Sequence, residues 1–279
     1  MIVLSSFTVI PLLEARRDNL ESATFTPDLG LSMVEVTLSK AGIQFQSGEQ
    51  FLWPVIEEIA EEENACFLLE NGTLQLIRKY SPAFDRFYSL YSTESAPTML
   101  ISGIPMHRIK GTNPRLDTQS KIKTLAPIGG NVLDTTTGLG YTAIEAAKTA
   151  SQVTTIELDP TALEIARLNP WSQGLFNNPK IQQVIGDSFE EIDRFSEGSF
   201  SAIIHDPPMF SLAGDLYSKT FYQRAFGVLK RNGKLFHYIG DPESKSGGRI
   251  TAGVIRRLKE AGFRQVIHKP QAFGVVAYK

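Results

Sequence analysis

Residues 132–143, with the sequence Val-Leu-Asp-Thr-Thr-Thr-Gly-Leu-Gly-Tyr-Thr-Ala, constrain the fold of this 279-residue chain more than any other segment. An apolar run ends in Asp134, a loop of threonines and glycines follows, and a helix is expected to begin near Tyr141. Loops of this kind let backbone N–H groups approach the negatively charged end of a ligand closely. The segment therefore predicts a strand–loop–helix unit built around a small ligand.

Asp134 separates two candidate ligands for this loop. The spacing of Gly138, Gly140 and Ala143 also fits the dinucleotide fingerprint. A carboxylate beside the pyrophosphate of a dinucleotide would cost on the order of 1 kcal/mol or more in a partly dry site. S-adenosylmethionine carries no phosphate, and its ammonium favours a nearby anion while its carboxylate favours N–H donors. The loop therefore favours S-adenosylmethionine over NAD, and a tight turn without any ligand is the structural alternative.

The order acid-x-x-x-Gly-x-Gly resembles motif I of class I S-adenosylmethionine-dependent methyltransferases. Thr136 stands where that motif usually has a glycine. The resemblance implies that Asp134, Thr136, Gly138 and Gly140 contribute to a cofactor site.

Composition describes an ordinary folded protein, with 42% apolar and 21% charged residues and a net charge of −2. A net charge this close to zero excludes strong overall electrostatic attraction to nucleic acid or to an anionic membrane. Residues 215–279 nevertheless hold thirteen Lys and Arg against four Asp and Glu, so RNA is a candidate partner of a basic C-terminal face. The single Cys66 provides no disulfide, and no His or Cys spacing suggests a metal site.

The first segment lacks the features of a signal peptide, and no run is long enough to span a membrane. We therefore expect a cytoplasmic protein with no membrane partner, and its oligomeric state is left open.

From residue 131 onward, strand and helix patterns alternate steadily, which predicts an α/β domain over residues 113–279. Helices are expected to start near residues 141, 160, 188, 218 and 248, with the helix from 218 ending at residues 229–233. The last two strands are too close in sequence for a crossover helix and should pair antiparallel. The expected fold is a doubly wound, mostly parallel seven-stranded sheet, which is the class I methyltransferase layout. The expected strands cover residues 132–134, 153–157, 181–185, 201–205, 234–239, 264–268 and 274–278.

Residues 1–112 predict a separate small α+β domain. Proline at a first helical position favours helices over 54–62, over 82–91 behind Ser81, and from Pro114 to about 125. The pair Asn71-Gly72 is a strong hairpin signal between its flanking apolar runs. The expected strands cover residues 34–38, 42–46, 66–70, 73–78, 98–101 and 106–109.

Acidic residues follow the next two strands of the expected sheet. Glu157 ends the second strand, where a carboxylate can accept both ribose hydroxyls of an adenosine. Asp187 and Ser188 follow the third strand, where methyltransferases of this layout often place an acid for the adenine amino group. Asp187 can equally cap the helix that begins there. These three residues complete the expected cofactor site.

The fourth strand ends in Asp206, Pro207 and Pro208. Two prolines in sequence fix φ and hold their carbonyl groups outward. The Asp206 side chain and these carbonyls can accept both N–H bonds of an amino group whose nitrogen faces a methyl donor. The segment predicts methyl transfer to a nitrogen acceptor, with a small amine or a nucleobase as the substrate.

Asp206–Pro208 resembles the Asp/Asn-Pro-Pro-aromatic motif of amino-group methyltransferases that act on nucleobases or protein amides. Met209 occupies the aromatic position and Phe210 follows one residue late, which weakens the case for a stacked planar base. Phe210 and Tyr217 are candidates for the wall of the substrate pocket. Thr118 and Lys121, in the segment ahead of the first strand of the sheet, are candidate contacts of a lid.

Residues 104–279 resemble the uncharacterised spermidine-synthase-like predicted methyltransferases of archaea and cyanobacteria. The runs 106–108, 117–118, 166–171, 205–208 and 210–211 carry this resemblance. It implies family membership and leaves the substrate open.

Two other functions remain as alternatives. One is aminopropyl transfer to a polyamine, since Asp206 occupies the place of the aspartate that acts as base in spermidine synthases. The other is a non-catalytic module that binds a cofactor or RNA without turnover.

Overall fold

The structure is a computed structural model that describes residues 1–46, 48–70, 72–209, 213–241, 243–244 and 247–279. The chain divides into two compact units. The first comprises Met1–Arg115 and Thr161–Gln173, and the second comprises Leu116–Pro160 and Gly174–Lys279. The domain boundary expected after residue 112 remains a prediction, because the first unit also takes residues from the second half of the chain.

The first unit contains three antiparallel sheets, in the orders β1-β6-β7, β2-β3-β4-β5 and β11-β10-β9-β8. The strands expected over 34–38 and 42–46 pair as β3–β4, and the hairpin expected around residues 71–72 is confirmed as β6–β7, although Asn71 itself lies outside the described residues. The strands are β1 (Ile2–Leu4), β2 (Ser22–Phe25), β3 (Val34–Leu38), β4 (Gly42–Phe45), β5 (Gln50–Leu52), β6 (Phe67–Glu70), β7 (Thr73–Leu76), β8 (Arg78–Ser81), β9 (Arg86–Tyr91), β10 (Thr98–Ile101) and β11 (Ile104–Pro105).

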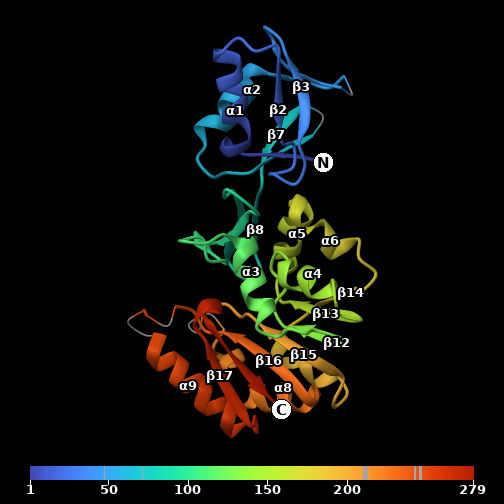
Figure 1. The fold of residues 1–279 in the computed structure, drawn as a ribbon, viewed down its shortest axis with the longest axis vertical. Helices are drawn as coiled ribbons and strands as arrows, with labels where there is room; N and C mark the ends of the chain where they lie inside the picture. Colours follow the sequence, from blue (N-terminus) through green and yellow to red (C-terminus); the bar gives the residue numbers. More distant parts are fainter. Residues whose placement is uncertain (47, 71, 210–212, 242, 245–246) are drawn as a thin grey trace. The chain divides into compact units, whose positions relative to one another are not determined.

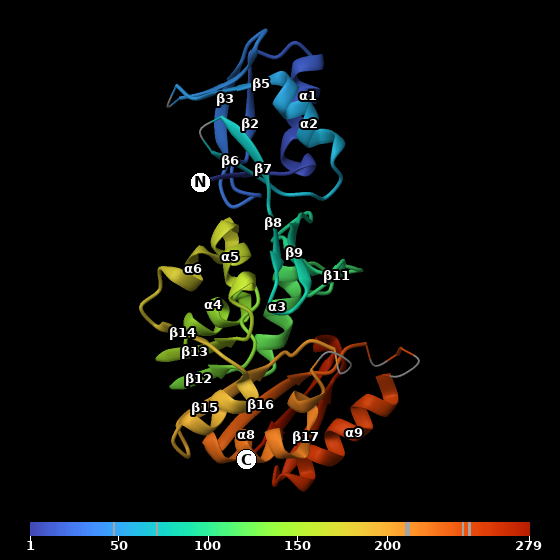
Figure 2. The same cartoon turned by 180° about the vertical axis from the view of Figure 1, so that it is seen from behind.

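Two helices, α1 (Ser6–Arg17) and α2 (Trp53–Glu61), lie side by side in this unit, as Figure 2 shows. The expected helix behind Pro54 is confirmed as α2. Its buried Ile56 and Ile59 belong to a hydrophobic core that includes Leu12 of α1 and Phe25 of β2. This unit also includes most of α5 (Pro160–Leu168) and the 3₁₀ turn η1 (Pro170–Ser172).

Two expectations for the first unit are wrong. Residues 86–91 form the strand β9 rather than a helix, because Tyr88 and Leu90 alternate into the interior with the period of a strand. The turn before β9 contains Asp85 in the left-handed region, with φ 49°, which ends β8 and starts the return strand. The strand expected over 106–109 is also wrong, since β11 covers Ile104–Pro105 and pairs with β10.

The second unit is organised around a seven-stranded sheet with the order β14-β13-β12-β15-β16-β18-β17. The five strands from β14 to β16 are parallel, and β18 pairs antiparallel with both β16 and β17. The doubly wound, mostly parallel sheet is therefore confirmed, with its antiparallel terminal pair. The strands are β12 (Asn131–Asp134), β13 (Gln152–Glu157), β14 (Ile181–Ile185), β15 (Phe200–His205), β16 (Leu229–Tyr238), β17 (Gln265–Lys269) and β18 (Gly274–Tyr278).

Helices lie on both faces of this sheet, with α4 on one face and α8 and α9 on the other (Figure 1). The helix expected from residue 218 ends earlier than predicted, because β16 already starts at Leu229 and Asn232 takes a left-handed φ of 65°. The helical elements are α3 (Pro114–Lys123), α4 (Tyr141–Ala147), α6 (Gln173–Phe176), α7 (Ser188–Glu191), η2 (Ile192–Arg194), η3 (Gly214–Tyr217), α8 (Lys219–Val228), α9 (Gly247–Glu260) and η4 (Pro270–Ala272).

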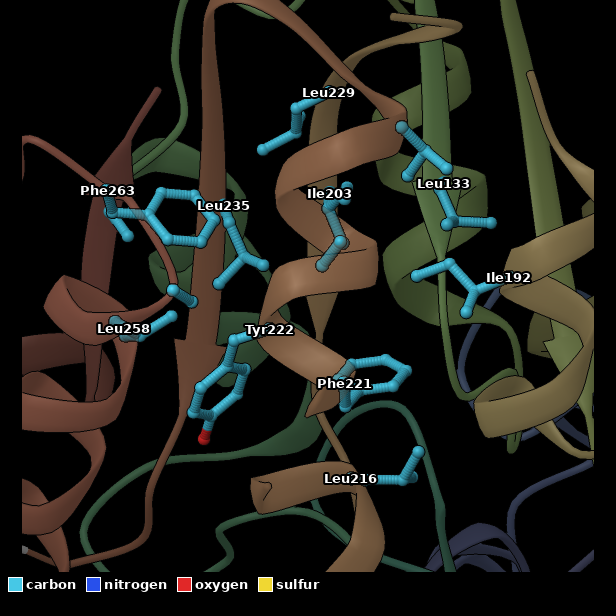
Figure 3. Close-up of a cluster of buried hydrophobic side chains, with 14 of the residues drawn as sticks. Leu133, Ile192, Ile203, Leu216, Phe221, Tyr222, Leu229, Leu235, Leu258 and Phe263 are labelled. Atoms are coloured by element: carbon cyan, nitrogen blue, oxygen red, sulfur yellow. The ribbon is translucent and has the colours of Figure 1, made fainter. Parts of the chain in front are cut away.

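A continuous hydrophobic core fills the space between the sheet and the helices α8 and α9. Figure 3 shows Phe221 and Tyr222 of α8 beside Ile203 and Leu235 of the sheet, with Leu258 of α9 close by. All five side chains are buried. Burying a side chain of this size stabilises a fold by about 1.5–3 kcal/mol, so this core fixes the strands whose ends form the site.

None of the described helices is both long enough and apolar enough to cross a membrane.

Candidate active site

The candidate site lies where the carboxyl ends of β12, β13 and β15 meet. In the sheet register Asp134 pairs with Thr155 of β13 on one side and with Ile204 of β15 on the other. The chain moves outward from β12 in one direction to β13 and β14 and later in the other direction to β15. Such a reversal point is the usual ligand crevice of an open α/β sheet.

Three threonines attach the loop after β12 to the neighbouring strands. The Thr135 N–H donates to the Ile204 carbonyl at 3.0 Å, and the Thr137 N–H donates to the Ile156 carbonyl at 2.9 Å. Between them, the Thr136 hydroxyl donates to the main-chain carbonyl of Asp206 at 2.8 Å. The side chains that replace glycines in this loop therefore fix its position against β13 and β15.

The two glycines of the loop both occupy left-handed backbone conformations, with φ of 53° for Gly138 and 76° for Gly140. Such values favour residues without a Cβ. A Cβ at Gly140 would also lie 2.7 Å from Cδ2 of Leu175. The sequence analysis attributed these glycines to ligand binding. The structure gives two further reasons for glycine: the left-handed φ of both residues and, at Gly140, the lack of space for a Cβ.

Asp134 is fully buried at the end of β12. Its Oδ2 accepts hydrogen bonds from the hydroxyls of Thr142, at 2.9 Å, and Thr155, at 3.2 Å. Its Oδ1 has no hydrogen-bond partner among the residues that the structure describes. Burial, with a smaller contribution from the nearby charge of Asp206, raises the pKa of Asp134 to about 7, while the Thr142 and Thr155 hydroxyls and the Thr136 N–H act in the opposite direction. A buried carboxylate oxygen without a donor suits a cationic ligand group.

Glu157 connects the second strand to the glycine loop. Its Oε2 accepts the Gly138 N–H at 2.8 Å and its Oε1 accepts the Asp159 N–H at 3.1 Å. Burial raises the pKa of the Glu157 carboxyl, while these two N–H donors act in the opposite direction. Two backbone donors hold the carboxylate in one orientation at the edge of the sheet.

Asp187 caps α7, which confirms one of the two roles expected for it. Its Oδ1 accepts the Phe189 N–H at 2.8 Å, and its side chain is exposed. The neighbouring Ser188 is buried and donates its hydroxyl to the carbonyl of Thr135. Ser188 therefore braces the loop from the third strand, and the contact of Asp187 with an adenine remains a prediction.

Asp206, immediately after β15, forms an ion pair that the sequence did not predict. Its Oδ2 lies 2.6 Å from Nζ of Lys121, which in turn lies 2.8 Å from Oδ2 of Asp117 one helical turn earlier on α3. Burial alone would lower the pKa of Lys121, but the two carboxylates outweigh it and hold that pKa above its ordinary value. The ring of Tyr238 also faces the ammonium, 4.4 Å from its centroid. Lys121 is therefore a buried cation and not a residue of an exposed helix face, while its contact with a ligand remains a prediction.

Pro207 and Pro208 follow Asp206, the first buried and the second partly buried. The hydroxyl of Tyr217 donates to the carbonyl of Pro208 at 3.0 Å. Burial and the charge of Asp206 raise the pKa of Tyr217, which keeps this hydroxyl protonated as a donor. Tyr217 therefore fixes the position of Pro208. The Pro208 carbonyl has one lone pair left to accept a hydrogen bond from a substrate.

The remaining residues singled out near the substrate pocket differ in burial. Met209 is half exposed at the position where the related motif has an aromatic residue. Phe210 lies outside the described residues. Thr118 is buried on α3, next to Asp117.

Two buried histidines near the strand ends, His205 and His237, make contacts within the protein core. The Nε2–H of His205 donates to the carbonyl of Leu216 at 2.9 Å, so its Nδ1 accepts the Thr135 hydroxyl at 2.7 Å. Burial lowers the pKa of His205 to about 3, which leaves its ring neutral at physiological pH. His237 lies beside it, with ring centroids 4.4 Å apart, and contacts the hydroxyl of Tyr222 at 2.9 Å.

Sequence reasoning missed Asp117 as a site residue, along with Thr142 and Thr155. The spacing of Asp117 and Lys121 was a usable signal, because residues four apart lie on one face of a helix. No local pattern links Thr155 to Asp134, since the register of two parallel strands sets that contact.

The residues of the site fit S-adenosylmethionine. The unpaired Oδ1 of Asp134 matches its ammonium, and the fixed carboxylate of Glu157 matches the ribose hydroxyls. Gly138 and Gly140 have no side chains, so a nucleoside could approach the backbone closely at these two positions.

Comparison with known proteins agrees with this fold. A family model described as methyltransferase small domain matches residues 113–241. The structure is similar to a crystal structure of spermidine synthase in complex with the transition-state analogue AdoDATO, with a TM-score of 0.61 and 20% identity, covering 78% of this chain and 79% of that one. It is also similar to spermidine synthase from Thermotoga maritima, with a TM-score of 0.57 and 20% identity over 77% of each chain. The strand order and the loop after β12 define a class I methyltransferase fold.

Two relatives in sequence extend the comparison. Uncharacterized protein MJ1233 from Methanocaldococcus jannaschii is 43% identical over 227 residues, which cover 81% of this chain and 77% of the relative. The chain belongs to the same family as that archaeal protein. A polyamine aminopropyltransferase from Sulfurisphaera tokodaii is 35% identical over 88 residues, covering 30% of this chain and 29% of the relative.

Proposed function

We propose that this protein is an S-adenosylmethionine-dependent methyltransferase that acts on a nitrogen acceptor. The observation that carries the proposal is the hydrogen bond from the Thr136 hydroxyl to the Asp206 carbonyl. It joins the loop expected to hold the cofactor to the segment expected to hold the acceptor. The match to the methyltransferase small domain over residues 113–241 supports the same reaction type.

In this proposal the ammonium, the ribose and the adenine of the cofactor each have a residue of matching chemistry. Asp134 holds the ammonium, Glu157 the ribose hydroxyls and Asp187 the adenine amino group. Gly138 and Gly140 give the backbone close access to the ligand. Bound at this edge of the sheet, S-adenosylmethionine would supply an electrophilic methyl group on a sulfonium.

Asp206 and the carbonyls of Pro207 and Pro208 orient the acceptor. As the nitrogen attacks, a nitrogen–carbon bond forms and the carbon–sulfur bond breaks, so the positive charge moves from sulfur to nitrogen. The acceptor nitrogen then gives up one proton to Asp206 or to water. Holding the reacting atoms about 3–3.5 Å apart supplies much of the rate enhancement, because the electrophile is already cationic.

The test measures transfer of tritium from S-adenosyl-L-[methyl-³H]methionine to RNA, peptides and small amines, together with cofactor affinity by calorimetry. The variant Asp206→Ala should abolish transfer and leave cofactor affinity within severalfold of wild type. The matched control Asp193→Ala removes an aspartate that is 55% exposed and should leave both unchanged. Equal loss of transfer and cofactor binding in Asp206→Ala would show that Asp206 is structural instead.

Aminopropyl transfer to a polyamine is the second candidate, favoured by the identity to a polyamine aminopropyltransferase over 88 residues. Calorimetry with S-adenosylmethionine and with its decarboxylated form discriminates the two reactions. A methyltransferase should bind the form with a carboxylate more tightly. Tighter binding of the decarboxylated form would replace the proposal with aminopropyl transfer.

A non-catalytic RNA-binding role for the basic C-terminal segment can be tested by measuring RNA binding by the same protein at increasing salt concentration. RNA retention that falls steeply with salt, without any labelled product, would favour that role over methyl transfer.

A further inference from the structure

The ion pair between Lys121 and Asp206 belongs to a group of three charges with unequal access to solvent. The side chains of Asp117 and Lys121 are 0% and 2% exposed, whereas that of Asp206 is 17% exposed. The Lys121 ammonium is shared between the two carboxylates. Of the three side chains, that of Asp206 is the most exposed, so a ligand in the site would meet this group through Asp206.

Asp206 is fixed at two points. Thr136 donates to its main-chain carbonyl, and Lys121 donates to Oδ2 of its side chain at 2.6 Å. Lys121 itself cannot swing away easily, since Asp117 lies 2.8 Å from its Nζ and the Tyr238 ring covers it. A buried ammonium costs several kcal/mol to desolvate unless partners compensate it, so this arrangement needs both carboxylates.

We propose that Lys121 is a positioning residue that acts through Asp206: it keeps the Asp206 carboxylate ionised and fixes its orientation beside the sulfonium of the cofactor. The inference rests on the proposed function, because it places S-adenosylmethionine in this site. It adds a role for Lys121 and Asp117, which contact neither the cofactor nor the acceptor in this scheme. An opposite charge within about 4–6 Å favours the ionised form of a carboxyl group.

Other titratable groups also surround Asp206 and must be separated from Lys121 in any pH experiment. Asp134 at the end of β12 and Tyr217 of η3 both respond to the charge of Asp206. Asp117 faces Lys121 from the same helix, and Tyr238 of β16 faces its ammonium. Of these, Asp134 titrates near pH 7 and would affect binding of any ligand that carries an ammonium.

The experiment compares the affinities of S-adenosylmethionine and S-adenosylhomocysteine across pH 5.5–8 by calorimetry. Both ligands carry the same ammonium, so the effect of Asp134 cancels in the ratio of their dissociation constants. Only S-adenosylmethionine carries the sulfonium, and the ratio therefore reports the charge of Asp206. In the wild-type protein, the preference for S-adenosylmethionine should stay constant across this range.

The test variant is Asp117→Asn with Lys121→Met, which removes one positive and one negative buried charge together. Without its cation, Asp206 should take up a proton at higher pH, and the preference should fall by about threefold to tenfold between pH 8 and pH 5.5. Asp206→Asn should show the reduced preference at every pH. The matched control Lys148→Met removes an exposed lysine paired with Glu145 and should behave as wild type.

If the preference for S-adenosylmethionine over S-adenosylhomocysteine does not change with pH in the double variant, as in wild type, the inference is wrong. If thermal unfolding shows that the double variant does not fold, Lys121→Gln replaces it, since an amide can donate to either carboxylate, and the same fall is expected. If neither ligand binds the wild-type protein, the proposed function itself fails. If both ligands bind and the preference does not depend on Asp206, only the role of Lys121 fails.

Discussion

The hydroxyl of Thr136 lies 2.8 Å from the main-chain oxygen of Asp206, across two strands that are adjacent in the sheet but 70 residues apart in sequence. Glycine usually occupies this position in the related motif, and a glycine could not make the bond. The contact couples the position of the cofactor loop to that of the carboxylate that faces the acceptor. A side chain that departs from the motif therefore has a structural function here.

Replacing Thr136 with valine keeps the shape of the side chain and removes this hydrogen bond. We expect the transfer rate to fall about tenfold, because small misplacements of catalytic groups are costly, while cofactor affinity changes less than threefold. Single-turnover kinetics and calorimetry give the two values. Thr136→Ser restores the hydroxyl and should recover most of the rate. A rate for Thr136→Val equal to wild type would show that the bond does not position Asp206.

Gly140 should tolerate a side chain poorly for two independent reasons. Its φ is 76°, and an added Cβ would lie 2.7 Å from Leu175. We expect Gly140→Ala to lower the free energy of unfolding by about 1–3 kcal/mol. Urea denaturation measures this change. Gly227→Ala in α8, where a Cβ would meet no atom within 4 Å, should instead raise stability by about 0.5 kcal/mol, so equal effects of both variants would contradict the prediction.

Much of the second unit could be predicted from sequence because its signals are local. The strands β12 and β15 are short and mostly apolar, and the helices after β13, β14 and β15 begin behind a proline or a capping residue. Periodicity and capping act over a few residues, so residues 131–278 reveal their order without tertiary information. The acids at the strand ends follow from the same reasoning, since parallel strands end at one edge.

The features that were predicted wrongly or missed depend on contacts between segments that are distant in sequence. The helix expected over 82–91 had good local start signals, but pairing of β9 with β8 and β10 favoured a strand. The ion pair of Lys121 with Asp206 joins residues 85 positions apart. Lys121 was expected as a contact of a lid, and its burial depends on the packing of α3, which no local pattern encodes.

Trp171 makes a long-range contact within the first unit that its sequence context did not indicate. Its indole Nε1–H donates to the carbonyl of Leu29 at 3.0 Å, and Leu29 is itself buried. Trp171→Phe should leave that carbonyl without its donor and lower the free energy of unfolding by about 1 kcal/mol. Trp53→Phe, which removes the analogous bond to the Ser39 carbonyl, provides the comparison in urea denaturation. No change in Trp171→Phe would mean that water replaces the indole.

The buried carboxyl of Asp134 should make stability depend on pH in a direction opposite to that of an ion-paired aspartate. Its pKa is about 7 in the folded protein against 3.8 for an unperturbed group. Between these values the folded chain holds a proton that the unfolded chain has lost, so stability falls as pH rises from about 4 to 7. Asp134→Asn should flatten this part of the profile. Chemical denaturation at several pH values tests the prediction, and an unchanged slope in the variant would contradict it.

The same proton should be released when S-adenosylmethionine binds. At pH 7 about half of the Asp134 carboxyls carry a proton, and an ammonium beside Oδ1 favours the ionised form. We therefore expect a net release of about half a proton per bound ligand at pH 7 relative to Asp134→Asn. Calorimetry in two buffers with different ionisation enthalpies measures this difference. Ligand binding with the same proton release in both proteins would show that the ammonium does not lie at Asp134, and the orientation of the cofactor in the site would then be wrong.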